Sequence, residues 1–151
     1  MSTKPPGGHE AIRVEGLAQF QRELRRVSND FPRELRLANL EAAEVVAKAA
    51  RAKAQALGGV ARKSAPSIKA TAEQRRAKVS FGGPKFPFAL GAEFGGGSRP
   101  STRQFKAWRG NDSGAGYFVF PEIRRTKDAF LEVYEKGLFD LIERAFTSRV
   151  A

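Results

Sequence analysis

Few side chains in this sequence are of the types that catalyse reactions or bind metals. The 151-residue chain has no cysteine and one histidine, His9, which lies in a stretch rich in proline and glycine. These counts exclude a thiolate metal site, a thiol nucleophile, a histidine metal cluster and a Ser-His-Asp arrangement. We therefore expect a protein that is not an enzyme, with no cofactor, no metal ion and no small-molecule substrate.

The carboxylate whose setting suggests acid/base chemistry is Glu93, which lies between aromatic residues in Ala92-Glu93-Phe94-Gly95. A general acid of this kind needs a pKa raised by burial and a partner carboxylate, and the sequence offers no obvious partner. A structural carboxylate bonded to arginine or to backbone N–H groups is the favoured interpretation. The run Gly95-Gly96-Gly97-Ser98 lacks the Gly-Lys-Ser/Thr ending and the preceding strand of a phosphate loop, so it predicts flexibility.

A second group interleaves aromatic and basic side chains between residues 103 and 109, around Phe105 and Trp108. Such a pattern could stack on single-stranded nucleic acid and neutralise it, or anchor a loop on a neighbouring subunit, since aromatics and arginine dominate interface hot spots. No recognisable nucleic-acid-binding motif accompanies the group, which favours the anchor. The candidate subunit-interface residues are Phe94, Gly95, Phe105, Trp108, Arg109 and Tyr117.

The positive charge is concentrated in one segment of the chain. Lys and Arg number 27 against 16 Asp and Glu, a formal net charge of +11. Residues 48–85 hold ten of these cations and one acid, so they carry 10 − 1 = +9. The segment predicts a surface for nucleic acid or for an acidic protein partner, with a solvated face and a cation-dressed helix end as the alternative. The candidate basic residues that face DNA or an acidic protein partner are Arg62, Lys63, Lys69, Arg75, Arg76 and Lys78.

Hydrophobic periodicity predicts the helices that position these residues. We expect a helix over 16–27, a long Ala-rich helix over 32–57 ended by Gly58-Gly59, and a last helix over 126–146. The long helix carries a seven-residue apolar repeat. Its members are Leu35, Ala38, Ala42, Val45, Ala49, Ala52 and Ala56. The shortness of the repeat favours an intramolecular core helix over a dimeric coiled coil.

The rest of the chain predicts a small antiparallel sheet and a long loop. Apolar and polar residues alternate over 67–72 and 77–81, with Glu73–Arg76 as the exposed hairpin tip. A helical turn over 88–94 precedes an irregular stretch over 95–116, and Tyr117–Phe120 reads as a buried strand stopped by Pro121. The predicted fold is therefore α+β: two N-terminal helices, a small antiparallel β-sheet with a long loop, and a C-terminal helix packed on the sheet. The expected organisation is a flexible tail at 1–11, a single domain at 12–147 with the extended 95–116 loop, and a C-terminal tail at 148–151.

The order of these elements and several short motifs resemble a known family. The motifs are Val14-Glu15-Gly16-Leu17, Ser67-Ile68, Glu93-Phe94-Gly95, Pro121-Glu122-Ile123, and the stretches 104–111 and 116–121. Together they resemble the tail-component family of long-tailed double-stranded-DNA bacteriophages, also called neck, head–tail joining or tail-completion proteins, in a variant of actinobacterial phages. The resemblance spans about residues 12–146. It departs from the family at Gly58-Gly59-Val60-Ala61, where Pro-x-x-Thr-Gly-x-Leu is usual.

The resemblance implies a non-enzymatic structural protein of the virion, made in the host cytoplasm and located at the head–tail junction or tail end. Such a protein forms a homo-oligomeric ring, expected to be six-fold. Its partners would be its own copies, the head-connector or stopper, tail-terminator and tail-tube proteins, and genomic DNA passing through without sequence specificity. A tail terminator or minor tail protein is the alternative within this class, and a basic nucleic-acid-binding protein is the alternative outside it. No apolar run approaches the ~18 residues of a membrane span, so no membrane partner is expected.

Overall fold

The computed structural model describes residues 30–74, 76–96, 105–110 and 114–150, together with Gln19, Arg22 and Arg26, and its side chains as far as 144. The predicted tail over 1–11, most of the predicted helix over 16–27, residues 97–104 and Arg75 lie outside this described part.

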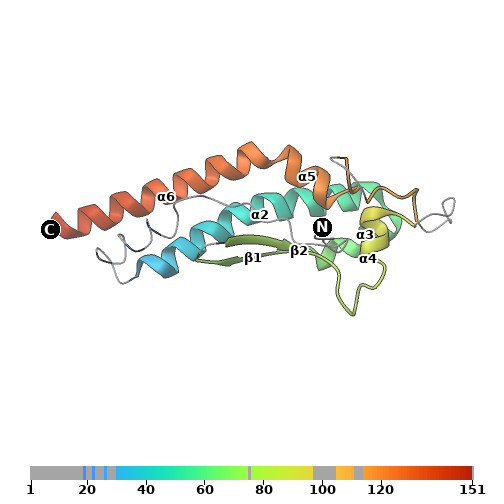
Figure 1. The fold of residues 1–151 in the computed structure, drawn as a ribbon, viewed down its shortest axis with the longest axis horizontal. Coiled ribbons are helices and arrows are strands. Elements are labelled where there is room, and N and C mark those ends of the chain that lie inside the picture. Colours follow the sequence, from blue (N-terminus) through green and yellow to red (C-terminus); the bar gives the residue numbers. More distant parts are fainter. Residues whose placement is uncertain are drawn as a thin grey trace, which may run out of the picture.

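Helix α2 (Phe31–Leu57) runs along most of the molecule (Figure 1). Pro32 stands in its first turn, where a missing N–H breaks no helical hydrogen bond, and Glu34 complements the positive end of the helix dipole. Gly58 ends the helix with a φ of 71°, and its N–H donates to the carbonyl of Gln55. The helix predicted over 32–57 is confirmed to within one residue.

The buried face of α2 differs from the predicted seven-residue repeat. Its buried residues are Phe31, Leu35, Ala38, Asn39, Ala42, Ala43, Val46, Ala47, Ala50 and Ala54. Ala52 and Ala56 of the predicted repeat are exposed instead. On a helix with 3.6 residues per turn, residues spaced by four turn by about 40° per step, so the buried face of α2 moves around the helix along its length. The second half of the predicted stripe was therefore wrong, because α6 (Lys127–Val150) covers the helix at Ala38, whereas α3 (Gly59–Ser64), α4 (Ala89–Phe94) and α5 (Val119–Arg125) cover it at Ala54.

A short helix, α3 (Gly59–Ser64), and a 3₁₀ turn, η1 (Ala65–Ser67), lead from α2 into the hairpin. Strands β1 (Lys69–Glu73) and β2 (Arg76–Ser80) pair antiparallel, with Ala70 opposite Val79 and Ala72 opposite Ala77. These four apolar residues are the partly buried side of the ribbon. The predicted hairpin and its inward-facing residues are confirmed.

Buried Asn39 fixes the tip of this hairpin to α2. Its side-chain amide donates to the backbone carbonyls of Glu73, at 3.0 Å, and Gln74, at 3.2 Å. Polar atoms in the interior need partners of this kind. The turn is therefore tied to the first half of α2 through a side chain that the apolar pattern does not include.

Three further helices complete the described chain. The turn predicted over 88–94 is helix α4 (Ala89–Phe94). Residues predicted as a buried strand instead enter helix α5 (Val119–Arg125). A short apolar run does not by itself distinguish strand from helix, and Pro121 is tolerated because it lies in the first turn. Helix α6 (Lys127–Val150) continues past the predicted end at 146, where no glycine or proline follows to stop it.

The elements form layers, with α2 between α6 and the hairpin (Figure 1). Gly137 of α6 lies so close to Ala38 of α2 that an added Cβ would stand 3.2 Å from the alanine Cβ. The start of α6 also reaches β2, because Phe130 and Tyr134 share a cluster with Val79. The α+β class predicted from the sequence is confirmed.

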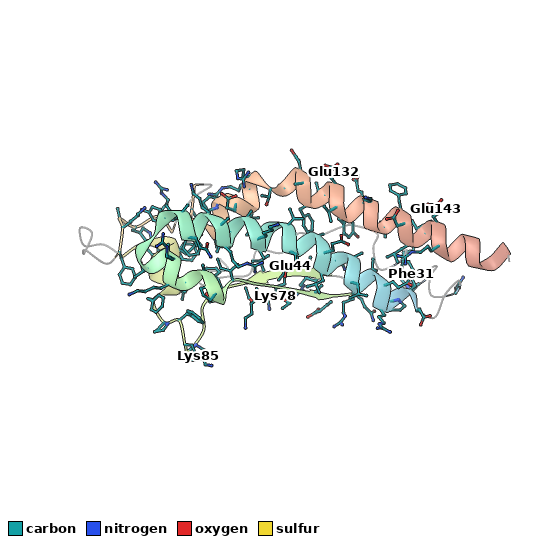
Figure 2. All side chains as sticks on the ribbon, turned by 180° about the vertical axis from the view of Figure 1, so that it is seen from behind. Phe31, Glu44, Lys78, Lys85, Glu132 and Glu143 are labelled. Carbon is teal, nitrogen blue, oxygen red and sulfur yellow. The ribbon has the colours of Figure 1, made fainter. Side chains whose placement is uncertain are left out.

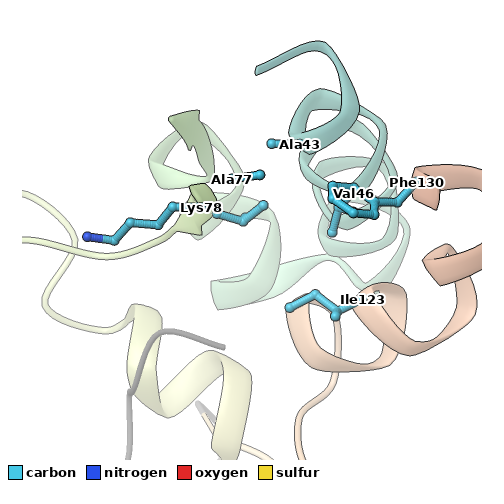
Figure 3. A pocket seen from close by; sticks show the side chains of 7 residues that line it. Ala43, Val46, Ala77, Lys78, Ile123 and Phe130 are labelled. Carbon is cyan, nitrogen blue, oxygen red and sulfur yellow. The ribbon is translucent and has the colours of Figure 1, made fainter. Parts of the chain in front are cut away.

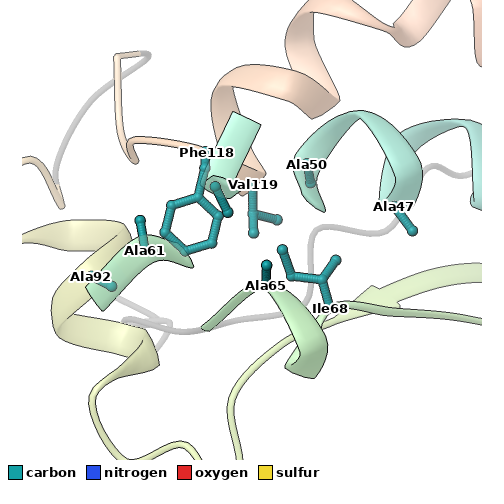
Figure 4. Packing of buried hydrophobic residues seen from close by; sticks show 9 residues of the cluster. Ala47, Ala50, Ala61, Ala65, Ile68, Ala92, Phe118 and Val119 are labelled. Carbon is teal, nitrogen blue, oxygen red and sulfur yellow. The ribbon is translucent and has the colours of Figure 1, made fainter. Parts of the chain in front are cut away.

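The main core lies where α2, α3, α4 and α5 converge (Figure 4). Alanines supply most of it: Ala47, Ala50, Ala54, Ala61, Ala65 and Ala92, joined by Ile68, Phe118 and Val119. Small side chains let the helix backbones approach closely around the one large ring, that of Phe118, which is fully buried. This core holds α4 and the start of α5 in place, and these two elements carry the candidate site.

Candidate functional site

Glu93 joins the end of α4 to the start of α5. Its side chain has no exposed surface. One carboxylate oxygen, Oε2, accepts the backbone N–H groups of Phe118 at 3.1 Å and Val119 at 2.9 Å, and Oε1 accepts that of Phe120 at 2.9 Å. The first N–H groups of a helix have no partner within the helix, and an anion is favoured there. The favoured interpretation of Glu93 as a structural carboxylate bonded to backbone N–H groups is confirmed.

Two opposing effects act on the pKa of Glu93. Burial raises the pKa of this carboxyl above its ordinary value, because the charged form loses its hydration. The N–H groups of Val119, Phe120 and Phe118 oppose the rise by stabilising the charged form, and burial is the larger effect. Gly116, with a φ of 87°, is needed beside this carboxylate, since a Cβ there would stand 2.0 Å from Oε1. Both carboxylate oxygens already accept N–H groups from the start of α5. Glu93 therefore acts structurally, by fixing the start of α5 to the end of α4.

The segment 105–110 lies against the end of α4. The Arg109 N–H donates to the Phe94 carbonyl, and the Gly96 N–H donates to the Lys106 carbonyl at 3.0 Å. Gly95 makes this approach possible, because its φ is 97° and an added Cβ would lie 2.3 Å from the Ala107 carbonyl oxygen. The described residues of the predicted 95–116 loop are thus seated on the domain by backbone hydrogen bonds.

Aromatic rings gather around Phe94. The centroid of its ring lies 5.3 Å from that of Phe120, 6.3 Å from that of Trp108 and 6.4 Å from that of Phe81, distances typical of attractive aromatic pairs. Phe94 and Gly95 were candidates for a subunit interface, but both are buried within the single chain. In this conformation Phe94 and Gly95 lie beneath the exposed side chains of the site and offer a partner almost no surface.

Tyr117 organises the cations of the site. Its hydroxyl donates to the Ala107 carbonyl at 2.7 Å. The guanidinium of Arg109 lies 4.4 Å from the centre of its ring, and the Lys106 ammonium lies 5.3 Å from it. Both distances are within the range of cation–π attraction. Two exposed cations are therefore fixed beside the aromatic cluster.

An apolar cleft of about 160 Å³ opens between Leu90 and Trp108, with Gly91, Phe94 and Gly95 as its remaining lining. Phe105 packs against α4 nearby, because a Cβ on Gly91 would stand 2.7 Å from its ring. The six residues predicted from the sequence as interface candidates thus come together in one region. Leu90 and Lys106 also belong to it; Lys106 was part of the aromatic–basic pattern, whereas no signal in the sequence singled out Leu90.

The basic candidate residues fall on two elements. Lys69, Arg76 and Lys78 share the outward side of the hairpin, where Glu73 stands opposite Arg76. Arg62 and Lys63 lie on α3 instead, and the Arg62 guanidinium donates to the Gln55 carbonyl at the end of α2. Arg62 is thus a capping residue for α2, in line with the helix-end alternative. Arg75 lies outside the described residues.

A second cavity lies between α2, β2 and the α5–α6 junction (Figure 3). Its lining is mostly apolar and includes Val46, Val79, Ile123 and Phe130. Its volume of about 20 Å³ matches that of one water-sized probe, well below the 300 Å³ or more of ordinary ligand sites. This cavity is a packing defect of the core and too small for a ligand.

Within the described ranges, no group of three or more His, Asp or Glu side chains is placed to hold a metal ion. Nor does any helix found there have the length and apolarity needed to cross a bilayer. Searches of protein-family models, of curated proteins and of solved structures returned no match to this chain.

Proposed function

We propose that this chain is a non-enzymatic structural protein that assembles with copies of itself. The observation that carries the proposal is the aromatic–cationic site on α4 and residues 105–110. Exposed Trp108 and Leu90 line an apolar cleft, and the segment that carries Trp108 also places Lys106 and Arg109 over the Tyr117 ring. Clustered aromatic and arginine side chains of this kind are typical of the anchors of protein interfaces. The pinned base of the loop lowers the entropy cost of using it for binding.

The resemblance of the sequence to the phage tail-component family adds a location to this proposal. The chain would form a ring, expected to be six-fold, at the head–tail junction or tail end of a long-tailed bacteriophage. There it would contact the connector or stopper, the tail terminator and the tail tube, and surround DNA without reading its sequence. A tail terminator or minor tail protein would be built on the same assembly principle.

Native mass measurement and negative-stain images of the purified chain test the proposal. We expect closed rings of one copy number, and joined heads and tails that contain the protein. A deletion of 95–116 is a poor variant for this purpose, because the segment carries hydrogen bonds that hold α4 and α5. A chain that stays monomeric, and that is absent from finished particles, would contradict the proposal.

The hairpin favours a second candidate function, binding of nucleic acid through its basic outward side. Lys69, Arg76 and Lys78 lie there on one side of a two-stranded ribbon. Replacing the three with serine should reduce the log–log salt slope of DNA binding by about 2.7, at about 0.9 per phosphate contact. The matched control replaces Lys53, Lys85 and Lys127, which removes the same charge elsewhere. Equal slopes in the two triple variants would contradict a binding site on the hairpin.

A further inference from the structure

Four large apolar side chains of the described residues are exposed: Leu37, Leu90, Trp108 and Phe139. Leu90 and Trp108 both line the 160 Å³ cleft. Phe139 is the most exposed of the four, at 68%, and lies on α6. The molecule thus exposes both a phenylalanine side chain and an apolar cleft. Removing the apolar surface of either from water would be favourable.

The surroundings of Phe139 on α6 are acidic. Leu138 and Leu141 of this helix pack toward Phe31 and Leu35, which places Phe139 away from the core. Glu132 and Glu135 lie seven and four residues before Phe139, and Glu143 lies four residues after it, so all three share its side of α6. All three are exposed. Figure 2 shows Glu132 and Glu143 along α6, at the edge of the molecule opposite the hairpin. Lys136 is the cation within one turn of Phe139 on the N-terminal side.

The surroundings of the cleft are basic. Lys106 and Arg109 are exposed, lie in the same short segment as Trp108, and have their cationic groups over the Tyr117 ring. The cleft, at about 160 Å³, is below the roughly 300 Å³ or more of ordinary small-molecule sites, a size that suits a single side chain. The cleft thus matches Phe139 in size and polarity, and its flanking charges are opposite to those beside Phe139.

We propose that copies of this chain join head to tail, with Phe139 of one copy seated between Leu90 and Trp108 of the next. The carboxylate of Glu135 then faces Lys106 and Arg109 across the contact. The two surfaces differ, so the contact is heterologous: repeated with a closing rotation it generates a ring, and without one a filament. This inference rests on the proposed self-assembly and names the surfaces that carry it.

A mixing experiment tests the head-to-tail contact. Phe139→Ala removes the inserted side chain, and Leu90→Glu places a carboxylate in the cleft, where it repels the acidic partner surface. Each variant alone should self-associate about thirtyfold more weakly than the unaltered chain, the loss typical of a central interface aromatic. An equimolar mixture should form a heterodimer, because each variant keeps the half that the other lacks. Leu37→Ala, another exposed apolar residue, is the matched control and should assemble normally.

Thermal unfolding of the separate variants should match that of the unaltered chain, since the altered side chains are 68% (Phe139) and 48% (Leu90) exposed. If the unaltered chain assembles and either variant assembles equally well, this contact is overturned while self-assembly stands. If the variants are monomeric and their mixture also stays monomeric, the contact is not head to tail and the inference is overturned. If the unaltered chain never assembles, the proposed function itself fails.

Discussion

Replacing Gly95 with alanine should release residues 105–110 from α4. The φ of 97° at Gly95 costs an L-residue about 1–2 kcal/mol. The new Cβ would also lie 2.3 Å from the Ala107 carbonyl oxygen and 2.8 Å from that of Lys106, and both are backbone atoms that cannot rotate away. Relief of the overlap breaks the two hydrogen bonds that Gly96 and Arg109 make across this contact, at about 1 kcal/mol each. The free energy of unfolding should therefore fall by about 3–4 kcal/mol.

Two other glycines separate strain from overlap in this prediction. Gly83 has a φ of 123° with open space around it, so Gly83→Ala tests strain alone and should cost about 1–2 kcal/mol. Gly114 has neither a positive φ nor a neighbour within 4 Å, and Gly114→Ala should change stability by less than about 0.5 kcal/mol. Urea unfolding of the three variants gives the comparison. If Gly95→Ala costs no more than Gly83→Ala, the seating of residues 105–110 on α4 is refuted.

Three further changes test the polar groups of the interior. Asn39→Asp should cost more than Asn39→Ala, which itself should cost about 2 kcal/mol, because a carboxylate would face the carbonyls of Glu73 and Gln74; equal costs in chemical unfolding would show that the tie to the turn is absent. Tyr134→Phe should leave stability unchanged or raise it by up to about 1 kcal/mol, since the Tyr134 hydroxyl is buried and has no hydrogen-bond partner among the residues that the structure describes; a loss above 1 kcal/mol would reveal a partner. Because burial raises the pKa of Glu93 above 4.5, its contribution is fully present below that pH and is lost as the pH rises through the folded-state pKa. The difference in unfolding free energy between the unaltered chain and Glu93→Gln should therefore shrink from pH 4.5 upward, and a growing difference would show that the N–H groups outweigh burial.

Local sequence signals were sufficient to predict the elements whose own residues favour one type of secondary structure. Helix α2 begins at a proline and ends at a glycine, and the hairpin alternates apolar and polar residues, so both were predictable from neighbouring residues. The run 117–120 was misassigned because the group that completes its helix, Glu93, is 25 residues or more away in the sequence. The buried stripe of α2 was half right, because the elements that cover the helix change from α6 to α3, α4 and α5 along its length, which a seven-residue count does not encode.

The candidate site was predictable in its composition and not in its geometry. The interleaving of aromatics with cations drew attention to Trp108 and Arg109, and both belong to the site. Burial of Phe94 and the cation–π contacts at Tyr117 depend on how residues 105–110 fold back on α4, which no local pattern encodes. Leu90 was missed because a single exposed leucine has no sequence signature before its neighbour across the cleft is known.

The hydrogen bonds between the Glu93 carboxylate and the start of α5 bear on how sequence changes in the neighbouring segment would be tolerated. The hydrogen bonds of Gly96 with Lys106 and of Arg109 with Phe94 join the two ends of the intervening segment. The ends therefore stay together whatever the length of the segment between them. Doubling the number of residues in a segment closed in this way costs only about 0.6 kcal/mol. Insertions and deletions beyond the seated segment should thus be tolerated far more readily than substitutions at its two ends.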